Sequence, residues 1–466
     1  MGRDALELAG DSLFVDKVRR TFKAAEADLL NRAHAFSQKK AFDGNSIGYK
    51  AADLLFDQDA DATTIAAALL APLIWQNLTD VGHVRERFGP DVSTALENLQ
   101  DSFFPTIDGR QGQGQNIRAV LASMGGIPRK AILLITFRLL ALESANESCG
   151  PDERKLAQET LDLLVPIANR LSLGDLRRRL EDACFYLLAP QEYDDLREKV
   201  APIQSEDDKC LEILLAGVKR LLVNNSIQGR VQGRTKSLHG IRRKMVRTGK
   251  IMDRIGLRVI VTSVPDCYTV LGLLHAHFKP IPGTFDDYIG LPKENGYQSL
   301  HTCVYPVREI SHKPIEFQIR TELMHLEAEH GTAAHWRYKN EGATVESDRQ
   351  RTQWMKGLIR QHREAASSQD FIERLHRQVF RDHLVVFGNG GRIVRLAENA
   401  TVRDYLKIIN AHVSQNATVK VNGQVIGLDC ALRDGDSIEV STDGEGIQSV
   451  IAQPKAATVS GIRSPP

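Results

Sequence analysis

The sequence predicts a multidomain protein that combines all-α and α+β parts, and three observations along its 466 residues lead to this class. Apolar residues recur at three- and four-residue spacing from about residue 14 to 190, which is typical of packed helices. From about 256 to 340, short β-branched runs alternate with helical segments, and this order favours a mixed sheet. From about 380 to 443, turn signals separate short strands, which indicates a small β-rich unit.

The individual elements follow from the same patterns. Helices are expected in the N-terminal half over 63–78 and 128–145, and a further helix over 211–225 leads toward the sheet. The central part is expected as strand 257–262, helix 263–278, a loop, strands 300–307 and 314–320, and helix 320–340. We place the domains at 1–195, 196–340, 341–378 (a charged helical connector) and 379–443, with a tail at 444–466 whose Ser, Pro, Ala and Gly content predicts disorder.

Bulk composition is that of a soluble globular protein, with 42% hydrophobic and 26% charged residues. The net charge of +1 gives no global field for DNA or a membrane surface. The 6 cysteines form no CxxC pair, which fits free thiols in a reducing compartment. No signal peptide or membrane-length apolar run is found, so we expect a cytoplasmic protein.

The segment from 228 to 258 is strongly basic, and Asp253 is its single acid. Such a run is most often a solvated face or a nonspecific nucleic-acid patch. A lone carboxylate beside a predicted strand also suits a polyphosphate held through a metal ion, because cationic side chains bind phosphate oxygens and the carboxylate binds the metal.

The strand PIEFQIR separates its side chains by the two-residue period. Ile315, Phe317 and Ile319 fall on one face, while Glu316, Gln318 and Arg320 fall on the other. An exposed polar face is the ordinary reading of this pattern. The alternative is a reactive face, on which Glu316 serves as a general base or helps to hold a metal ion.

The loop GTFDDYIGLPKENGYQSLHT precedes this strand and carries residue types that suit a nucleotide. Tyr297 could stack on a base, Asn295 and Lys293 could contact phosphates, and His301 could donate to a phosphate or orient a hydroxyl. By contrast, the histidines at 325, 330 and 335 are spaced by five residues and do not match a helical HExxH metal site, so we expect packing or phosphate contacts there.

The segment from Gly233 to Lys339 closely resembles the synthetase domain of the RelA/SpoT family. The matching text is GRTKS, RRKM, MDRIGLRVIV, PIPGTFDDYI, PKENGYQSLHT, IEFQIRT and MHLEAEHGTAAHWRYK. The resemblance implies a nucleotidyltransferase-like α+β fold. It also implies a Mg²⁺-dependent pyrophosphokinase that transfers the β,γ-diphosphate of ATP to the ribose 3′-hydroxyl of GDP or GTP and so makes the alarmone (p)ppGpp.

The resemblance also assigns roles to matching positions. On the ATP side it implies that Arg234 stacks on adenine and that Lys236 and Lys244 bind phosphate. On the acceptor side it implies that Tyr297 stacks on guanine, with Lys293, Asn295 and His301 beside it. It further implies that Asp253 binds magnesium, that Glu316 binds metal and activates the 3′-hydroxyl, and that Gln318 supports them.

Two positions depart from the family pattern. His239-Gly240 stands where a Tyr-Ser pair is usual after GRxKS. In the loop tied to acceptor preference and metal response, Asp286-Asp287 matches synthesis-only members, but Thr284 replaces the expected glutamate.

The N-terminal half resembles the family's helical HD hydrolase domain but lacks its metal ligands. Aligned by eye, the first His falls at Gly48, the His-Asp pair at Ala71-Pro72, and the later Asp at Phe137. These side chains cannot ligate a metal. Neither His nor Asp occurs in 64–79 or 125–145, so we expect a degenerate pseudo-hydrolase that does not break down (p)ppGpp.

The segment from 379 to 443 resembles a TGS domain, a small β-grasp-like module that contacts deacylated tRNA on the ribosome in long family members. Binding of tRNA and ribosome is therefore implied by resemblance alone. Two alternatives to an active synthetase remain from the sequence: a catalytically silent nucleotide-binding regulator, and an RNA-binding adaptor that uses the basic segment.

Overall fold

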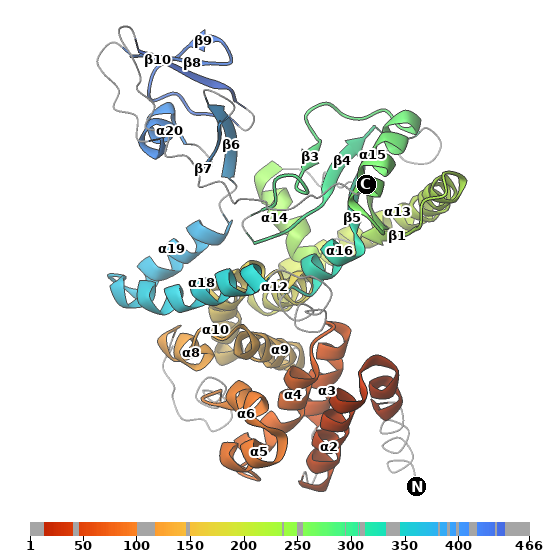
Figure 1. Ribbon diagram of the computed structural model, residues 1–466, viewed down its shortest axis with the longest axis vertical. Helices are drawn as coiled ribbons and strands as arrows, with labels where there is room; N and C mark the ends of the chain where they lie inside the picture. The colour runs from red at the N-terminus through yellow and green to blue at the C-terminus, as the bar shows by residue number, and fades with distance from the viewer. Residues whose placement is uncertain are drawn as a thin grey trace, which may run out of the picture. The chain divides into compact units, whose positions relative to one another are not determined.

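The structure is a computed structural model, and it describes residues 14–40, 46–99, 117–145, 150–234, 237–248, 255–293, 295–305, 307, 313–331, 345–380, 383–388, 392–397, 400–409, 417–433 and 436–442. The chain divides into two compact units, Met1–Val379 and Phe380–Pro466 (Figure 1). Among the described residues, no helix combines the length and apolar character needed to cross a membrane.

The first part of unit 1 is helical, as predicted. Its elements are α2 (Ala24–Lys40), α3 (Ser46–Asp57), α4 (Ala62–Trp75), α5 (Val81–Phe88), α6 (Pro90–Leu96), α8 (Ile117–Met124), α9 (Pro128–Ser144), α10 (Pro151–Glu159), the π-helix η2 (Thr160–Leu164), α11 (Val165–Arg170) and α12 (Gly174–Leu188). The Ala- and Leu-rich α4 begins where Asp61 accepts a hydrogen bond from the Thr64 N–H at 3.0 Å. Residues 62–74 of this helix are nearly all buried, so α4 lies at the centre of the helical half.

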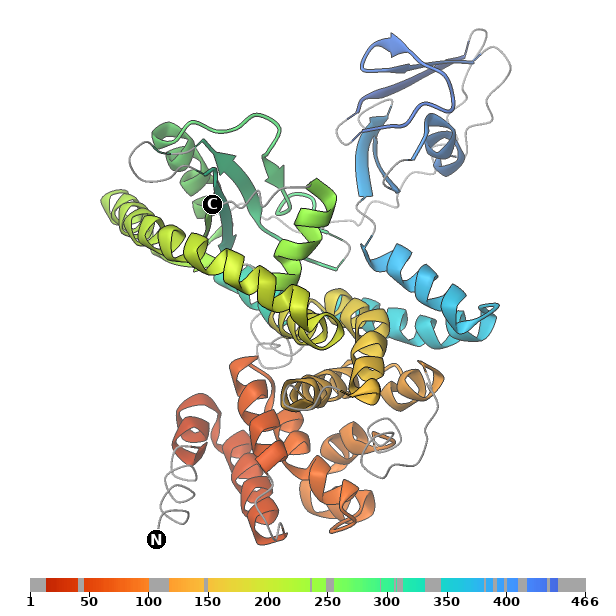
Figure 2. The ribbon, with the colours of Figure 1, turned by 180° about the vertical axis from the view of Figure 1, so that it is seen from behind.

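The 35-residue helix α13 (Pro190–Asn224) leads from the helical half to the sheet, and Figure 2 shows it running along the sheet. The boundary predicted at 195/196 falls inside this continuous helix. Its second half buries Leu214, Val218 and Leu222 against the strands. The two parts of unit 1 are therefore joined by a continuous helix rather than by a loop.

The central sheet has the order β1-β2-β5-β4-β3 and is mixed, as predicted. Its strands are β1 (Gly229–Arg234), β2 (Ile255–Val261), β3 (Asp286–Asp287), β4 (Leu300–Val304) and β5 (Ile315–Thr321), with β2 and β5 parallel and the other pairs antiparallel. The helices of this part are α14 (Leu238–Thr248), α15 (Val264–His277) and α16 (Glu322–Glu329).

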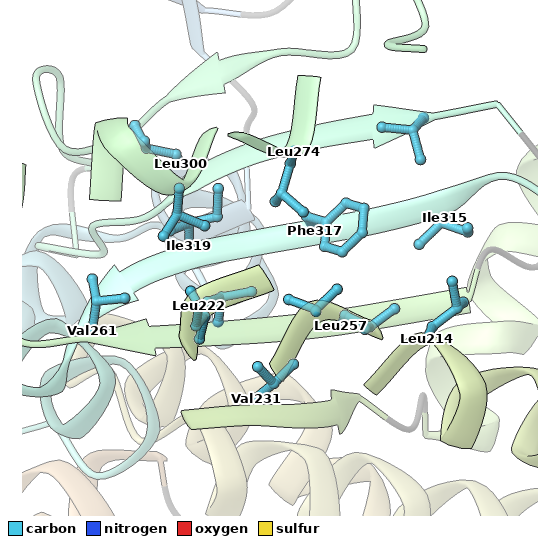
Figure 3. Close-up of a cluster of buried hydrophobic side chains, with 14 of the residues drawn as sticks. Leu214, Leu222, Val231, Leu257, Val261, Leu274, Leu300, Ile315, Phe317 and Ile319 are labelled. Carbon is cyan, nitrogen blue, oxygen red and sulfur yellow. The ribbon is translucent and has the colours of Figure 1, made fainter. Parts of the chain in front are cut away.

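The core lies on one face of this sheet (Figure 3). Ile315, Phe317 and Ile319 of β5 are fully buried there, against Leu274 of α15 and the apolar side chains of α13. This confirms the apolar face predicted for PIEFQIR and leaves the opposite face of β5 to Glu316, Gln318 and Arg320. That opposite face is not exposed as the ordinary reading assumed, since Gln318 is 4% and Arg320 0% exposed.

Two helices, α18 (Val345–Glu364) and α19 (Ser368–Phe380), follow in the region predicted as a helical connector. Unit 2 contains β6 (His383–Gly388), β7 (Arg392–Ala397), α20 (Val402–Ile408), β8 (Ala417–Val421), β9 (Gln424–Val425) and β10 (Ile438–Thr442). β6 pairs with β7, and β8 lies between β10 and β9. The predicted turn at VNGQ is present, with Asn422 at φ 51° and Gly423 at φ 81°, as a tight hairpin requires.

Candidate active site

The polar face of the central sheet gathers one row of side chains that spans all five strands. Neighbouring Cα atoms pair in the order Gln232 (β1), Arg258 (β2), Gln318 (β5), His301 (β4) and Asp286 (β3). Paired residues on adjacent strands project to the same face. The register therefore places the predicted residues His301, Gln318 and Asp286 beside each other, although they are up to 32 positions apart in sequence.

The adjoining row contains the predicted base. Arg234 pairs with Gly256, and Gly256 pairs with Glu316, so one residue without a side chain separates the backbone positions of Arg234 and Glu316. Gln318 Nε2 donates to Glu316 Oε1 at 3.4 Å. The predicted metal ligand Asp253 lies outside the described residues. In the chain it precedes Ile255 by two positions, and Ile255 pairs with the neighbour of Glu316, Ile315.

An aromatic cluster forms next to these rows. Tyr297 Oη and His301 Nε2 are hydrogen-bonded at 2.8 Å, and the two rings meet edge to face. Tyr288 contacts both rings, with centroids 6.2 Å from Tyr297 and 5.2 Å from His301. Lys293 Nζ lies 4.5 Å above the Tyr288 ring. Tyr297 is partly exposed, and Lys293 lies over the neighbouring Tyr288 ring. This arrangement suits a nucleotide, with the base on an aromatic ring and the phosphates near the lysine.

Asp286 and Asp287 have different surroundings. Asp286 is exposed at the strand edge. Asp287 accepts from Tyr268 Oη at 2.9 Å and from the N–H groups of Ile289 and Gly290 at 2.9 and 2.8 Å. Asp287 thus shapes the loop, and Asp286 remains the acid that faces outward.

Of the two departures from the family pattern, Thr284 fastens the fold through its side chain, whereas His239 contributes a backbone N–H that does not depend on its side chain. The Thr284 hydroxyl donates to the Ile281 carbonyl at 2.7 Å and accepts from the Cys303 N–H at 3.3 Å, which fastens the loop to β4. The His239 N–H donates to Asp182 of α12 at 2.9 Å at the start of α14. Burial raises the pKa of Asp182, while hydrogen bonds from the start of α14 lower it in part.

A buried ionic cluster forms where Arg258 and Arg320 of the polar face meet α16 and α12. Glu329 Oε1 accepts from Arg258 at 2.7 Å and from Arg320 at 2.9 Å, and its Oε2 accepts from Arg178 of α12 at 2.6 Å. Burial alone would raise the pKa of Glu329, but these three guanidiniums hold it well below its usual range. Arg320 also donates to His325 Nδ1 at 2.8 Å. Burial, with the charges of Arg320 and Arg258, lowers the pKa of His325 to about 3.

Asn295 has contacts that the sequence did not suggest. Its side-chain amide donates to the Asn169 carbonyl at 3.2 Å, and its own carbonyl accepts from Ser172 Oγ at 2.6 Å. Its Oδ1 accepts from the Tyr297 N–H at 3.2 Å. In this structure Asn295 joins the loop to the helical half, and its predicted phosphate contact stays a prediction.

Four predicted ATP-side and metal residues cannot be placed fully. Lys236 and Asp253 lie outside the described residues, and for Arg234 and Lys244 only the backbone is described. Among the histidines, His325 and His330 are placed, and His335 lies outside. His330 Nδ1 is 3.3 Å from Gln58 Oε1, so both placed histidines make packing and hydrogen-bond contacts as predicted.

No cluster of three or more His, Cys, Asp or Glu side chains suited to a metal ion is found in the part of the chain that the structure describes. Magnesium bound to a nucleotide needs only one or two carboxylates, because phosphates and water complete its shell. Glu316, a half-buried carboxylate held by Gln318 at the polar face, fits that requirement.

The positions aligned with hydrolase ligands are filled by apolar packing. Gly48 is buried in α3, and Ala71 and Pro72 are buried inside α4. Phe137 of α9 is 1% exposed and meets the Trp75 ring edge to face at 4.7 Å. These helix faces pack as an ordinary core.

Several residues of the site were missed from the sequence. Tyr288 could have been found, because it follows the Asp286-Asp287 pair at a spacing that returns it to the same face. No local sequence pattern predicts that Arg258, Arg178 and Glu329 meet. Only the strand register and the packing of α12 against α16 bring them together.

An HD-type helical half followed by a mixed α+β domain with a polar, partly buried face defines the class of protein. A family model described as an HD domain matches residues 27–174, and one described as a region found in RelA / SpoT proteins matches residues 233–343. The chain therefore carries a RelA/SpoT region that follows an HD-type region.

Two curated relatives illustrate the similarity. A probable guanosine-3′,5′-bis(diphosphate) 3′-pyrophosphohydrolase of Synechocystis sp. is 34% identical over 402 residues, covering 84% of this chain and 52% of the relative. A GTP pyrophosphokinase of Haemophilus influenzae is 32% identical over 428 residues, covering 89% of this chain and 57% of the relative. The chain thus spans a little over half the length of these relatives, whose names include both a pyrophosphohydrolase and a pyrophosphokinase.

Among solved structures, the small alarmone synthetase 1 from Bacillus subtilis is 25% identical, with a TM-score of 0.27, and covers 36% of this chain and 94% of that one.

Proposed function

We propose that this chain is a synthesis-only alarmone synthetase that transfers diphosphate from ATP to the 3′-hydroxyl of GDP or GTP and makes (p)ppGpp. The observation that carries the proposal is the strand register. It sets Glu316 in one row with the backbone of Arg234. Two residues further along β5, on the same face, Gln318 pairs with His301, which is hydrogen-bonded to Tyr297. The RelA/SpoT region at 233–343 covers this same site.

The chemistry follows from these positions. Tyr297 stacks on guanine, and its hydroxyl is fixed by His301. Glu316, oriented by Gln318, accepts the proton of the ribose 3′-hydroxyl. The 3′-oxygen then attacks the β-phosphorus of ATP, the bond to the α-phosphate oxygen breaks, and AMP leaves. Such transfers depend on positioning and charge neutralisation, which the cationic segment 228–258 supplies.

Magnesium would neutralise charge on the transferring diphosphate and would be held by Glu316 together with Asp253. Arg234, Lys236 and Lys244 would hold ATP. Lys293 would hold phosphates of the acceptor, with Asp286 at the rim of its site. The roles of Asp253 and of these ATP-side cations are assigned from their match to the family motif alone.

The same proposal holds that the chain does not hydrolyse (p)ppGpp. Support comes from the buried Gly48, Ala71, Pro72 and Phe137 at positions where the hydrolase would carry metal ligands. Since the relatives' names include hydrolases, general similarity does not decide this point, and the local residues do.

We also propose that unit 2 is a TGS-like module, on the basis of its paired strands and the helix α20. Binding of deacylated tRNA and of the ribosome, in the cytoplasm, belongs to the same proposal and follows from the family resemblance.

The test is a single-residue comparison. With ATP, Mg²⁺ and GDP or GTP, the wild-type chain forms a 3′-pyrophosphorylated product, and Glu316→Gln lowers the rate by about 100-fold or more, as expected for loss of a general base. The matched control is Glu322→Gln, six residues away on an exposed side chain paired with Arg230, and it keeps full activity. Undiminished synthesis by Glu316→Gln would falsify the site. Absence of product from the wild type, also with ribosomes and tRNA, would favour a silent nucleotide-binding regulator.

A further inference from the structure

The segment that carries the proposed guanine-stacking tyrosine is tied to the helical half of unit 1. We call residues 295–301 the acceptor segment. Ser172 Oγ donates to the Asn295 carbonyl at 2.6 Å, and Asn295 Nδ2 donates to the Asn169 carbonyl at 3.2 Å. On its other side, Asn295 Oδ1 accepts from the Tyr297 N–H at 3.2 Å. One asparagine therefore connects the helical half directly to the backbone of Tyr297.

The partner of Asn295 is a tight turn, Asn169–Leu173, that ends α11. The Leu173 N–H donates to the Ala168 carbonyl at 2.9 Å, and Ser172 lies at φ 58°. A serine in this left-handed region is disfavoured and persists only where its surroundings fix it. Ser172 is 6% exposed, so the turn presents its hydroxyl to Asn295 from a buried position.

A second contact holds the same turn against the sheet domain. Gly331, at φ 51° after α16, lies against the backbone of Leu171 and Ser172, where a Cβ atom would overlap the Leu171 carbonyl oxygen. The turn is thus enclosed between the end of α16 and Asn295.

An independent route from the helical half reaches the same tyrosine. Arg178 of α12 binds Glu329, Glu329 binds Arg320, and the Arg320 guanidinium lies 5.9 Å from the centroid of the Tyr297 ring. The helical half is therefore linked to Tyr297 by two indirect routes. One runs through Asn295 to the Tyr297 backbone, and the other runs through Glu329 and Arg320 to the Tyr297 ring.

We propose that the Asn169–Leu173 turn, through Ser172, is a positioning element of the guanine-nucleotide site. It fixes the acceptor segment so that Tyr297 is preorganised for the base. This inference rests on the proposed function and gives the helical half a role that needs no metal: the acceptor site is incomplete without it.

The test uses the full chain with Ser172→Ala and Ser172→Gly. Both remove the hydroxyl, but glycine also relieves the conformation at φ 58°, so an equal loss in both variants separates the missing hydrogen bond from backbone strain. Calorimetric titration should show the Kd for GDP raised about three- to tenfold, as expected for one hydrogen bond, with the Kd for a non-hydrolysable ATP analogue unchanged. The control is Ser226→Ala, an exposed serine at φ 56° that ends α13, which should leave both Kd values unchanged.

Hydrogen exchange supplies a readout that does not depend on ligand. Amides in residues 295–301 should exchange faster in both Ser172 variants and not in Ser226→Ala. Wild-type GDP affinity together with wild-type exchange in 295–301 in the Ser172 variants would overturn the proposal and leave the proposed function standing. Failure of the proposed function has its own signature: the wild-type chain then forms no 3′-pyrophosphorylated product, whatever the Kd and exchange values of the Ser172 variants.

Discussion

At the scale of single residues, the polar groups of the site work in pairs whose partners fix their orientation. Tyr297 is held by His301, Glu316 by Gln318, and Asp287 by Tyr268. A side chain held before the ligand arrives loses less entropy on binding. The polar side chains of the site are therefore preorganised for a ligand.

Two substitutions of Tyr297 distinguish base stacking from hydrogen bonding. Tyr297→Ala should raise the KM for the guanine nucleotide about 10- to 100-fold, because base stacking on an aromatic ring is lost. Tyr297→Phe keeps the ring and loses only the bond to His301, so its KM should rise by less than about fivefold. Steady-state kinetics with ATP saturating measures both. An alanine variant with the wild-type KM would place the base elsewhere.

The lowered pKa of His325 predicts that the free energy of unfolding decreases at acidic pH. Its pKa is lowered from 6.5 to about 3 in the folded chain, so the folded state binds fewer protons than the unfolded state between these values. The associated stability is fully present above pH 6.5 and is lost as pH falls toward 3. His325→Asn keeps an acceptor for Arg320 and does not titrate. Urea unfolding of unit 1 at pH 7 and pH 5 should show a smaller loss in this variant, and an equal loss would contradict the assignment.

At the scale of elements, helix α12 stabilises the sheet domain at two places. It supplies Arg178 to Glu329 at the end of α16 and Asp182 to the start of α14. Because α14 follows the predicted ATP-side segment and α16 follows β5, one helix braces both sides of the proposed site.

The cluster around Glu329 should be a major contribution to the stability of unit 1. Glu329→Gln leaves three guanidiniums without their carboxylate, and breaking such a buried set costs about 3 kcal/mol or more. The exposed Glu322→Gln should change the free energy of unfolding by less than about 0.5 kcal/mol. Chemical denaturation measures the free energy of unfolding of both variants. Similar small losses in the two would show that the cluster does not stabilise unit 1.

The sequence predicted those elements whose pattern is local. β2, β4 and β5 and the helix α15 follow from apolar runs, and the two faces of β5 follow from its alternation. Strand β1 was missed because its text, GRVQGR, has no β-branched run. It becomes a strand through pairing with β2, and Gly233 fits because Leu211 of α13 lies against it.

The candidate site was predicted in its residue types but not in its support. Glu316 and Gln318 share a face because side chains alternate along a strand, and this much is readable from the sequence. His301 stands beside Gln318 through the register of β4 and β5, and Tyr297, which precedes β4, joins them through its hydrogen bond to His301. The tether from Ser172 to Asn295 joins positions 123 apart, and no periodicity reports such a contact. The same holds for Arg178 and Glu329, which are 151 apart.

At the scale of the whole molecule, the helical half and the sheet domain form one unit through the continuous helix α13 and the contacts of α12. The residues aligned with hydrolase ligands in α3, α4 and α9 take no part in the hydrogen bonds from Ser172 to Asn295 and from Arg178 to Glu329. These links therefore do not depend on which residue types stand at the aligned positions.

Manganese should restore no hydrolysis. Purified (p)ppGpp incubated with the full chain and Mn²⁺ is expected to stay intact, because Gly48, Ala71 and Phe137 offer no ligating side chain. Chromatography of released diphosphate measures this. Mn²⁺-dependent release above a protein-free control would show that the hydrolase centre lies in residues other than those aligned here.

We propose above all that this chain makes the alarmone and does not remove it. The most direct measurement follows (p)ppGpp over time in one reaction with the full chain, ATP, GDP and Mg²⁺, with Mn²⁺ added after ATP is exhausted. Product and AMP are expected to rise together in equal amounts, and the product level should then stay constant. A level that falls after Mn²⁺ is added, or a reaction in which AMP and product never appear, would contradict it.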